Sequence, residues 1–161
     1  MDGRTEIISR LVAEHSRKLI AYSRLICRDF ELARDAVADT FYKLCELESI
    51  DEEKAAAWLY KTCRNRTIDI LRKRKPCAEL DEAEISKLAE ESDKPDVLRR
   101  EKLLFLIAKL PPMQREILML RYFSDLKYSE IALALGVSQS FVGVAISRAL
   151  ETLKRDMQNE K

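Results

Sequence analysis

Hydrophobic residues recur along the first half of the chain at intervals of three and four, the spacing that places them on one face of an α-helix. In the segment 4–28 they lie at positions 7, 8, 11, 12, 19, 20 and 26, and the segment 31–48 repeats the pattern. A third periodic segment begins near Glu52 and should continue to Pro76, because proline cannot extend a helix. Three helices that share an apolar side predict a compact domain over residues 1–75.

The second half of the chain shows the same period in four segments. We expect helices over 97–109, from Pro111-Pro112 onward, over 127–135, and from a turn at 136–138 to about Met157. They predict a second small helical domain over residues 97–161. The chain has only three glycines and four prolines among 161 residues, too few for a fold of strands and tight turns. The predicted fold class is therefore all-α, with two small helical domains.

Residues 76–96 differ from both halves. The sequence CAELDEAEISKLAEESDKP is acidic, has few large apolar residues and lies between Pro76 and Pro95. This composition predicts a linker. Two interpretations stay open, a solvated spacer and an acidic tether that shields a basic surface until DNA competes for it.

Composition excludes several classes of protein. Hydrophobic residues make up 47% and charged residues 35%, typical of a folded helical protein. The chain has no apolar run of membrane-spanning length and no signal-peptide pattern, so we expect a cytoplasmic protein. Its cysteines, Cys27, Cys45, Cys63 and Cys77, lack metal-ligand spacing and His15 is the one histidine, so we expect apolar fillers and no metal. Without paired carboxylates, a nucleophile–base motif or a phosphate loop, we expect neither an enzyme nor a cofactor.

The net charge of +1 conceals strong segregation of charge along the chain. Residues 29–53 carry a net charge of −7, residues 54–77 carry +7, residues 78–96 carry −6 and residues 97–161 carry +4. A polyanion would therefore meet particular basic patches rather than the whole surface.

The stretch LALGVS, within 133–138, matches the turn of a helix-turn-helix. Ala132 is small where the second helix crosses the first, Gly136 tolerates a left-handed backbone, and Ser138 is a favoured N-cap. The apolar residues that would seal the helix pair are Ile131, Leu135, Val137, Val142 and Ile146. The alternative is two packed helices with an incidental glycine.

The last helix should bury one stripe and offer the other face to DNA. Helical geometry predicts that the buried stripe consists of Val142, Ile146, Leu150, Leu153 and Met157. The residues expected to meet DNA are Ser138, Gln139, Ser140, Phe141, Val144, Ser147 and Arg148. Because Phe141 and Val144 can contact only thymine methyls, this helix should position the protein more than it specifies a sequence.

The third helix carries the strongest basic patch. Lys61, Asn65, Asp69 and Arg72 follow one another at helical spacing, opposite an apolar side. The neighbouring residues that widen the patch are Trp58, Arg64, Arg66, Lys73, Arg74 and Lys75. A row of cations follows phosphates, and an amide between them can bond a base edge. The alternative is a solvated helix end whose cations favour the helix dipole.

Taken in order, these segments resemble a bacterial sigma factor of the extracytoplasmic-function (ECF) group of the sigma-70 family, which keeps only regions 2 and 4. RDAVADTFYKL resembles region 2.2, AWLYKTCRNRTIDILRKRK resembles regions 2.3–2.4, and LPPMQREILMLRYFSDLKYSEIALALGVS with ISRALETLKR resembles region 4. The resemblance covers nearly the whole chain.

The resemblance implies partners and roles. Region 2.2 would bind the clamp helices of the polymerase β′ subunit through Asp35, Asp39 and Lys43. Regions 2.3–2.4 would recognise and melt the −10 promoter element around Asn65, and region 4 would read the −35 element and contact the β flap. An anti-sigma factor would mask both domains. The implied function is promoter recognition, DNA melting and transcription initiation by core RNA polymerase.

The chain departs from the family pattern at two places. Ala38 and Asp39 stand where the family usually has Gln and Glu, and Gly143 lies in a recognition helix that lacks the usual Lys and Arg. Two rival functions are a decoy that binds polymerase or an anti-sigma factor without initiating, and a stand-alone helix-turn-helix regulator that uses residues 1–75 for dimerisation.

Overall fold

The structure is a computed structural model that describes residues 3–74 and 97–159, and every regular element in these ranges is helical. The prediction of an all-α fold is therefore confirmed. The predicted linker at 76–96 lies outside the described residues, and so does Cys77.

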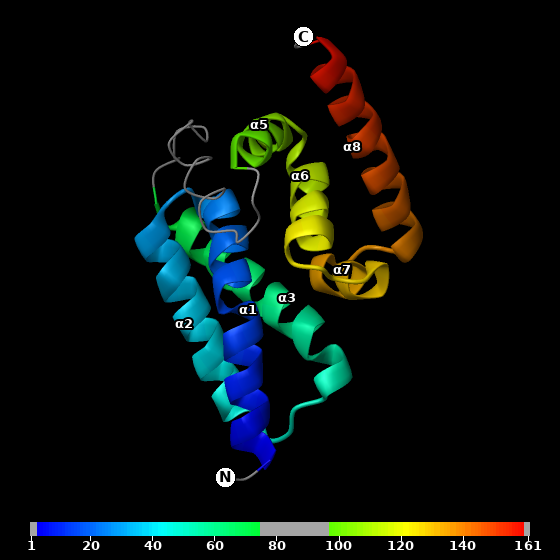
Figure 1. Cartoon of the computed structure of the whole chain (residues 1–161). Coiled ribbons are helices and arrows are strands. Elements are labelled where there is room, and N and C mark those ends of the chain that lie inside the picture. Colours follow the sequence, from blue (N-terminus) through cyan, green and yellow to red (C-terminus); the bar gives the residue numbers. More distant parts are fainter. Residues whose placement is uncertain (1–2, 75–96, 160–161) are drawn as a thin grey trace.

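The N-terminal bundle consists of α1 (Gly3–Cys27), α2 (Phe30–Glu46) and α3 (Glu52–Arg72), which pack against one another in pairs (Figure 1). Aspartates start the second and third helices, because the Asp29 carboxylate accepts from the backbone N–H of Leu32 at 3.2 Å and Asp51 caps α3. The predicted continuation of the third helix to Pro76 is wrong. It ends at Arg72, and the backbone N–H of the C-cap residue Lys73 donates to the carbonyls of Ile70 and Leu71.

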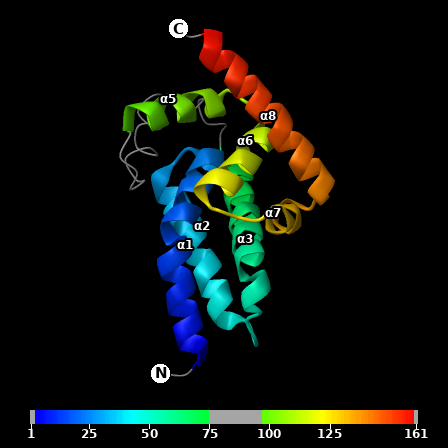
Figure 2. The same cartoon turned by 45° about the vertical axis from the view of Figure 1, so that its right-hand side comes forward.

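The C-terminal unit consists of α5 (Val97–Ala108), α6 (Pro112–Leu118), the π-helical turn η1 (Met119–Phe123), α7 (Tyr128–Leu135) and α8 (Gln139–Asn159). Pro112 occupies the first turn of α6, where its missing N–H costs no hydrogen bond. Helix α8 packs against α6 and α7, and its C-terminal part extends away from the rest of the molecule (Figure 2).

The turn between α7 and α8 has the geometry that its sequence predicted. Gly136 adopts a left-handed conformation with φ of 69°, and the Ser138 hydroxyl accepts from the N–H of Phe141 at 3.0 Å. The two helices are bent by 104° to one another, within the range of a helix-turn-helix. Within residues 3–74 and 97–159, no single helix is long and apolar enough to cross a membrane. Helices α7 and α8 meet that test only together, as a bent pair.

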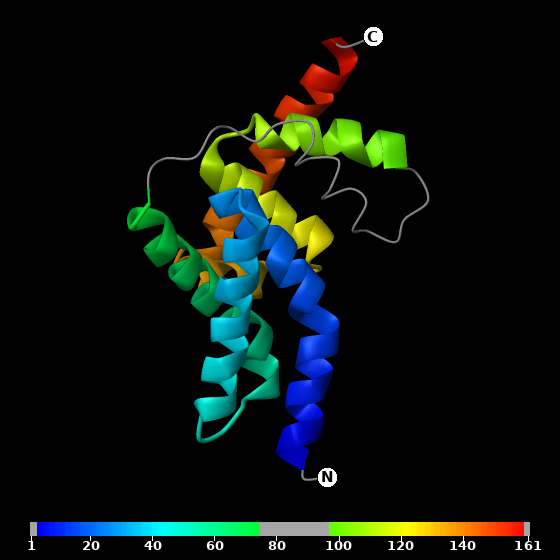
Figure 3. The same ribbon diagram turned by 90° about the vertical axis from the view of Figure 1, so that its left-hand side faces the viewer.

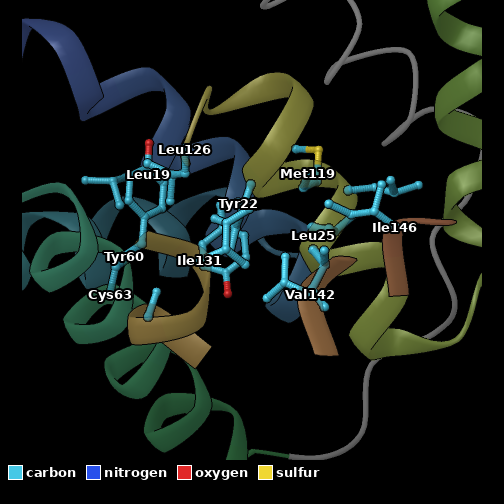
Figure 4. Packing of buried hydrophobic residues seen from close by; sticks show 14 of the residues in the cluster. Leu19, Tyr22, Leu25, Tyr60, Cys63, Met119, Leu126, Ile131, Val142 and Ile146 are labelled. Carbon is cyan, nitrogen blue, oxygen red and sulfur yellow. The ribbon is translucent and has the colours of Figure 1, made fainter. Parts of the chain in front are cut away.

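One hydrophobic core runs through both halves of the molecule. Helix α3 contacts α7, and α1 contacts η1, so that the C-terminal unit lies against the upper part of the N-terminal bundle (Figure 3). Figure 4 shows Leu19, Tyr22 and Tyr60 of the bundle gathered in one cluster with Leu126 and Ile131 of the C-terminal unit. The sequence did not predict this packing of one half on the other.

Two sequence-based expectations about buried residues need correction. Leu150 and Met157 are exposed, because α8 instead buries the small residues Ala145 and Ala149, which allow a close approach to α6 and α7. Cys45 is exposed at the end of α2 rather than filling apolar space.

Candidate nucleic-acid interface

The row of polar side chains on α3 lies at the surface as the sequence predicted. Lys61, Asn65, Asp69 and Arg72 are all exposed, together with Lys73 beyond the end of the helix. They share one side of α3, so an extended strand of nucleic acid would meet three cations, an amide and one carboxylate.

The opposite side of α3 is fixed against α1. The hydroxyls of Ser23 and Thr67 share a hydrogen bond of 2.7 Å, and Thr67 also donates to the carbonyl of Cys63 at 2.7 Å. Burial raises the pKa of the Cys63 thiol to about 11, so this cysteine stays a neutral part of the core. The rigid attachment holds the exposed row in a defined orientation.

Three other predicted DNA contacts are engaged within the protein. Arg66 Nε donates to Asp39 Oδ2 at 2.7 Å, and Arg74 Nη1 lies 3.2 Å from Asp29 Oδ2. Trp58 is half-buried against the core. Neither Arg66 nor Arg74 is a free cation in this state, although both side chains keep an exposed edge.

Arg64 is held most firmly. Its Nε donates to Oε1 of Glu116 on α6 at 2.7 Å, and the Arg64 side chain is only 22% exposed. The hydrogen bond to Glu116 raises the pKa of Arg64, against the opposing effect of burial. The side chain of Arg64 is therefore bonded to the C-terminal unit and does not belong to the exposed row.

The predicted DNA face of α8 is open to solvent along its length. Its exposed members are Ser138, Gln139, Ser140, Phe141, Val144, Ser147 and Arg148. Phe141 is 47% and Val144 50% exposed, which makes the centre of this face apolar. The helix N-terminus adds unpaired backbone N–H groups that favour phosphate.

The predicted polymerase face of α2 is divided. Asp35 and Lys43 are exposed, whereas Asp39 is half-buried beside Arg66. Sequence reasoning missed Tyr42, which is 68% exposed and lies seven residues after Asp35, on the same face. Its signal was an aromatic residue at a polar position of the helical pattern, and such residues often anchor interfaces.

Sequence reasoning also missed Glu116 and Tyr22, which join the two halves. Glu116 falls three residues after Met113 and directly before Ile117, so it is a charged residue within an apolar stripe. In the described parts of the chain, no group of three or more His, Cys, Asp or Glu side chains is placed to hold a metal ion.

Comparison with known proteins gives two family matches. Residues 11–76 match the model for Sigma-70 region 2, and residues 100–153 match that for Sigma-70, region 4. The chain is 30% identical over 131 residues to the ECF RNA polymerase sigma factor SigM of Bacillus subtilis (strain 168), covering 79% of this chain and 80% of SigM. It is 27% identical over 151 residues to the RNA polymerase sigma factor SigV of the same strain, covering 92% and 90%.

Among solved structures, the chain is similar in fold to CnrH in a complex with the cytosolic domain of CnrY. The TM-score is 0.69 at 24% identity, and the match covers 99% of this chain and 92% of that one.

These matches define a promoter-recognition protein built from the two conserved regions of a sigma factor. The chain belongs to the sigma-70 family and, within it, to the ECF sigma factors. Its function is to recognise promoters and direct transcription initiation.

Proposed function

We propose that the exposed row on α3 recognises and melts the −10 element. The observation that supports this role is that Lys61, Asn65 and Arg72 face solvent together on a helix whose other side is fixed to α1. The two cations hold the phosphates of the strand while the Asn65 amide bonds the edge of an unstacked base. Asp69 orients Arg72, three residues further along the same face.

For the −35 element, we propose that α8 enters the major groove. Ser138, Gln139 and the helix N-terminus contact phosphates, and the side chains of Phe141 and Val144 contact thymine methyls. Arg148 adds a phosphate contact from the next turns of the helix. Specificity at this element then depends on a few methyl groups and on groove shape rather than on hydrogen bonds to bases.

The protein partners follow from membership of the family. We propose that α2 binds the clamp helices of the polymerase β′ subunit through Asp35, Asp39 and Lys43, with Tyr42 as an aromatic anchor. The C-terminal unit contacts the β flap. CnrH forms a complex with the cytosolic domain of CnrY, and a similar complex between this chain and an anti-sigma factor is the corresponding proposal here.

A decoy function is the second candidate, and one observation favours it. The centre of the α8 face is apolar, and exposed Phe141 and Val144 also suit a protein surface. A decoy would bind core polymerase or an anti-sigma factor without starting transcription.

The experiment for the −10 role uses the holoenzyme. Asn65→Ala and Arg72→Ala should keep the affinity for core polymerase but abolish the permanganate reactivity of unpaired thymines in the −10 region. Arg17→Ala is the control, because Arg17 is an exposed cation on α1 away from the row. Parental reactivity in both α3 variants would exclude this row from melting.

A further inference from the structure

Glu116 is a buried carboxylate that links the two halves of the protein. Its side chain is 10% exposed, and its Oε1 accepts from the Tyr22 hydroxyl of α1 at 2.7 Å and from Arg64 Nε of α3 at 2.7 Å. Arg64 Nη2 lies 3.4 Å from Oε2. One carboxylate of the C-terminal unit thus holds two of the three helices of the N-terminal bundle.

The surroundings of Glu116 make these bonds strong. Burial raises the pKa of Tyr22 well above its usual range, with Glu116 adding to the effect, so Tyr22 remains a neutral donor. Charge-assisted hydrogen bonds in a desolvated site are stronger than neutral ones in water. Lys18 and Asp125 add a peripheral ion pair at 3.5 Å between α1 and the loop after η1.

The side chain that Glu116 holds is also one of the predicted DNA contacts. Arg64 belongs to the basic patch of α3, and a guanidinium binds a carboxylate and a phosphate with the same geometry. While Glu116 holds it, the Nε and Nη2 donors of Arg64 are engaged and cannot form a bidentate contact with a phosphate. The exposed row of Lys61, Asn65 and Arg72 remains accessible, so only part of the patch is withheld.

The arrangement in which the two halves pack together, here called the closed arrangement, is also too short to span the two elements of a promoter. The −10 and −35 elements are about 25 base pairs apart by their names, or about 85 Å along the duplex. The longest helix among the described residues, α1, has 25 residues and spans only about 37 Å. Helices α3 and α8 both contact α7, so in this arrangement they lie close together and cannot stand about 85 Å apart until the halves separate.

We propose that Glu116 is a latch that closes the free sigma factor by holding Arg64 and Tyr22, and that this latch opens before the protein spans a promoter. The inference rests on the proposed role of α3 in binding the −10 strand. The latch lowers the affinity of the free protein for DNA until polymerase separates the two halves.

The first measurement is the radius of gyration of the full chain in solution, by small-angle X-ray scattering. Glu116→Gln removes the charge with little change in shape, and Tyr22→Phe removes only one hydroxyl. Each should raise the radius above that of the parent, Glu116→Gln by more. Glu53→Gln, at an exposed carboxylate in the first turn of α3, is the matched control and should leave the radius unchanged. Circular dichroism establishes that each variant is folded.

The second measurement is binding of the free protein to a labelled oligothymidine at fixed salt. Because Glu116→Gln releases the guanidinium of Arg64 for one more charge-assisted contact with a phosphate, this variant should bind the oligonucleotide about tenfold more tightly than the parent. Adding Arg64→Gln to Glu116→Gln should remove most of that gain. A parental radius in both latch variants, or an expanded Glu116→Gln with parental affinity for the oligonucleotide, would overturn the proposal.

Failure of the latch is distinguishable from failure of the proposed function. If the latch variants stay compact while the parent still melts a promoter with polymerase, only the latch is wrong. If they expand and bind the oligonucleotide more tightly but Asn65→Ala and Arg72→Ala still melt the promoter, the latch is supported and the −10 assignment fails.

Discussion

Two glycines of the helix-turn-helix predict opposite effects for the same substitution. Gly136 has φ of 69°, and a side chain added there would meet nothing within 4 Å. Alanine at this position therefore lowers the free energy of unfolding only by the backbone strain of a left-handed residue, about 1–2 kcal/mol. Gly143 lies inside α8 outside the left-handed region, and an added Cβ would touch Tyr128 at 3.7 Å, an ordinary contact. Alanine there should stabilise the helix by about 0.5–1 kcal/mol.

The assay is chemical denaturation of the full chain, followed by circular dichroism. Gly136→Ala should lower the free energy of unfolding by about 1–2 kcal/mol, and Gly143→Ala should raise it by about 0.5–1 kcal/mol. In thermal melts the corresponding shift is about 2–4 °C for each kcal/mol in a chain of this size. The double variant should give the sum of the two effects, because each acts on its own backbone.

Either of two results would refute this reasoning. A neutral Gly136→Ala would mean that the turn does not hold a left-handed residue. A destabilising Gly143→Ala would mean that α7 and α8 lie closer together than the 3.7 Å contact with Tyr128 indicates.

Three further predictions concern DNA, polymerase and pH. Replacing a contacted thymine of the −35 element by uracil should weaken binding by about 1 kcal/mol. Val144→Ala should erase that sensitivity, whereas Arg148→Ala should weaken all sequences alike and flatten the salt dependence. Asp35→Arg should lower the affinity for core polymerase, and a variant that competes as well as the parent would contradict the assigned face. Burial lowers the pKa of His15, so stability should be complete above pH 6.5 and fall as the pH drops below it, a loss that His15→Gln should reduce in urea titrations.

The turn and its two helices could be predicted from the sequence because they depend on residues that are neighbours in the chain. Gly136, Ser138 and the apolar period determined the turn and both of its helices, and each has the predicted geometry. The polar row on α3 was predictable for the same reason, since Lys61, Asn65, Asp69 and Arg72 recur at helical spacing opposite the apolar side of the helix.

The packing of the two halves was not predictable in the same way. Periodicity indicates which face of a helix is apolar, but it does not indicate which element covers that face. Leu150 and Met157 were assigned to the core by period alone, whereas the alanines at 145 and 149 allow the closer contact and take their place. Glu116 was recognisable only as a charge within an apolar stripe, and its partners lie 94 and 52 residues away in the sequence.

The most direct test of the account combines this protein with purified core RNA polymerase and promoter DNA. We predict specific transcripts together with permanganate-reactive thymines at the −10 element, and both should disappear in Asn65→Ala and Arg72→Ala. Binding to core polymerase without initiation at any promoter would contradict the account and support the decoy function. Binding to duplex DNA as a dimer, without affinity for polymerase, would instead support the stand-alone regulator.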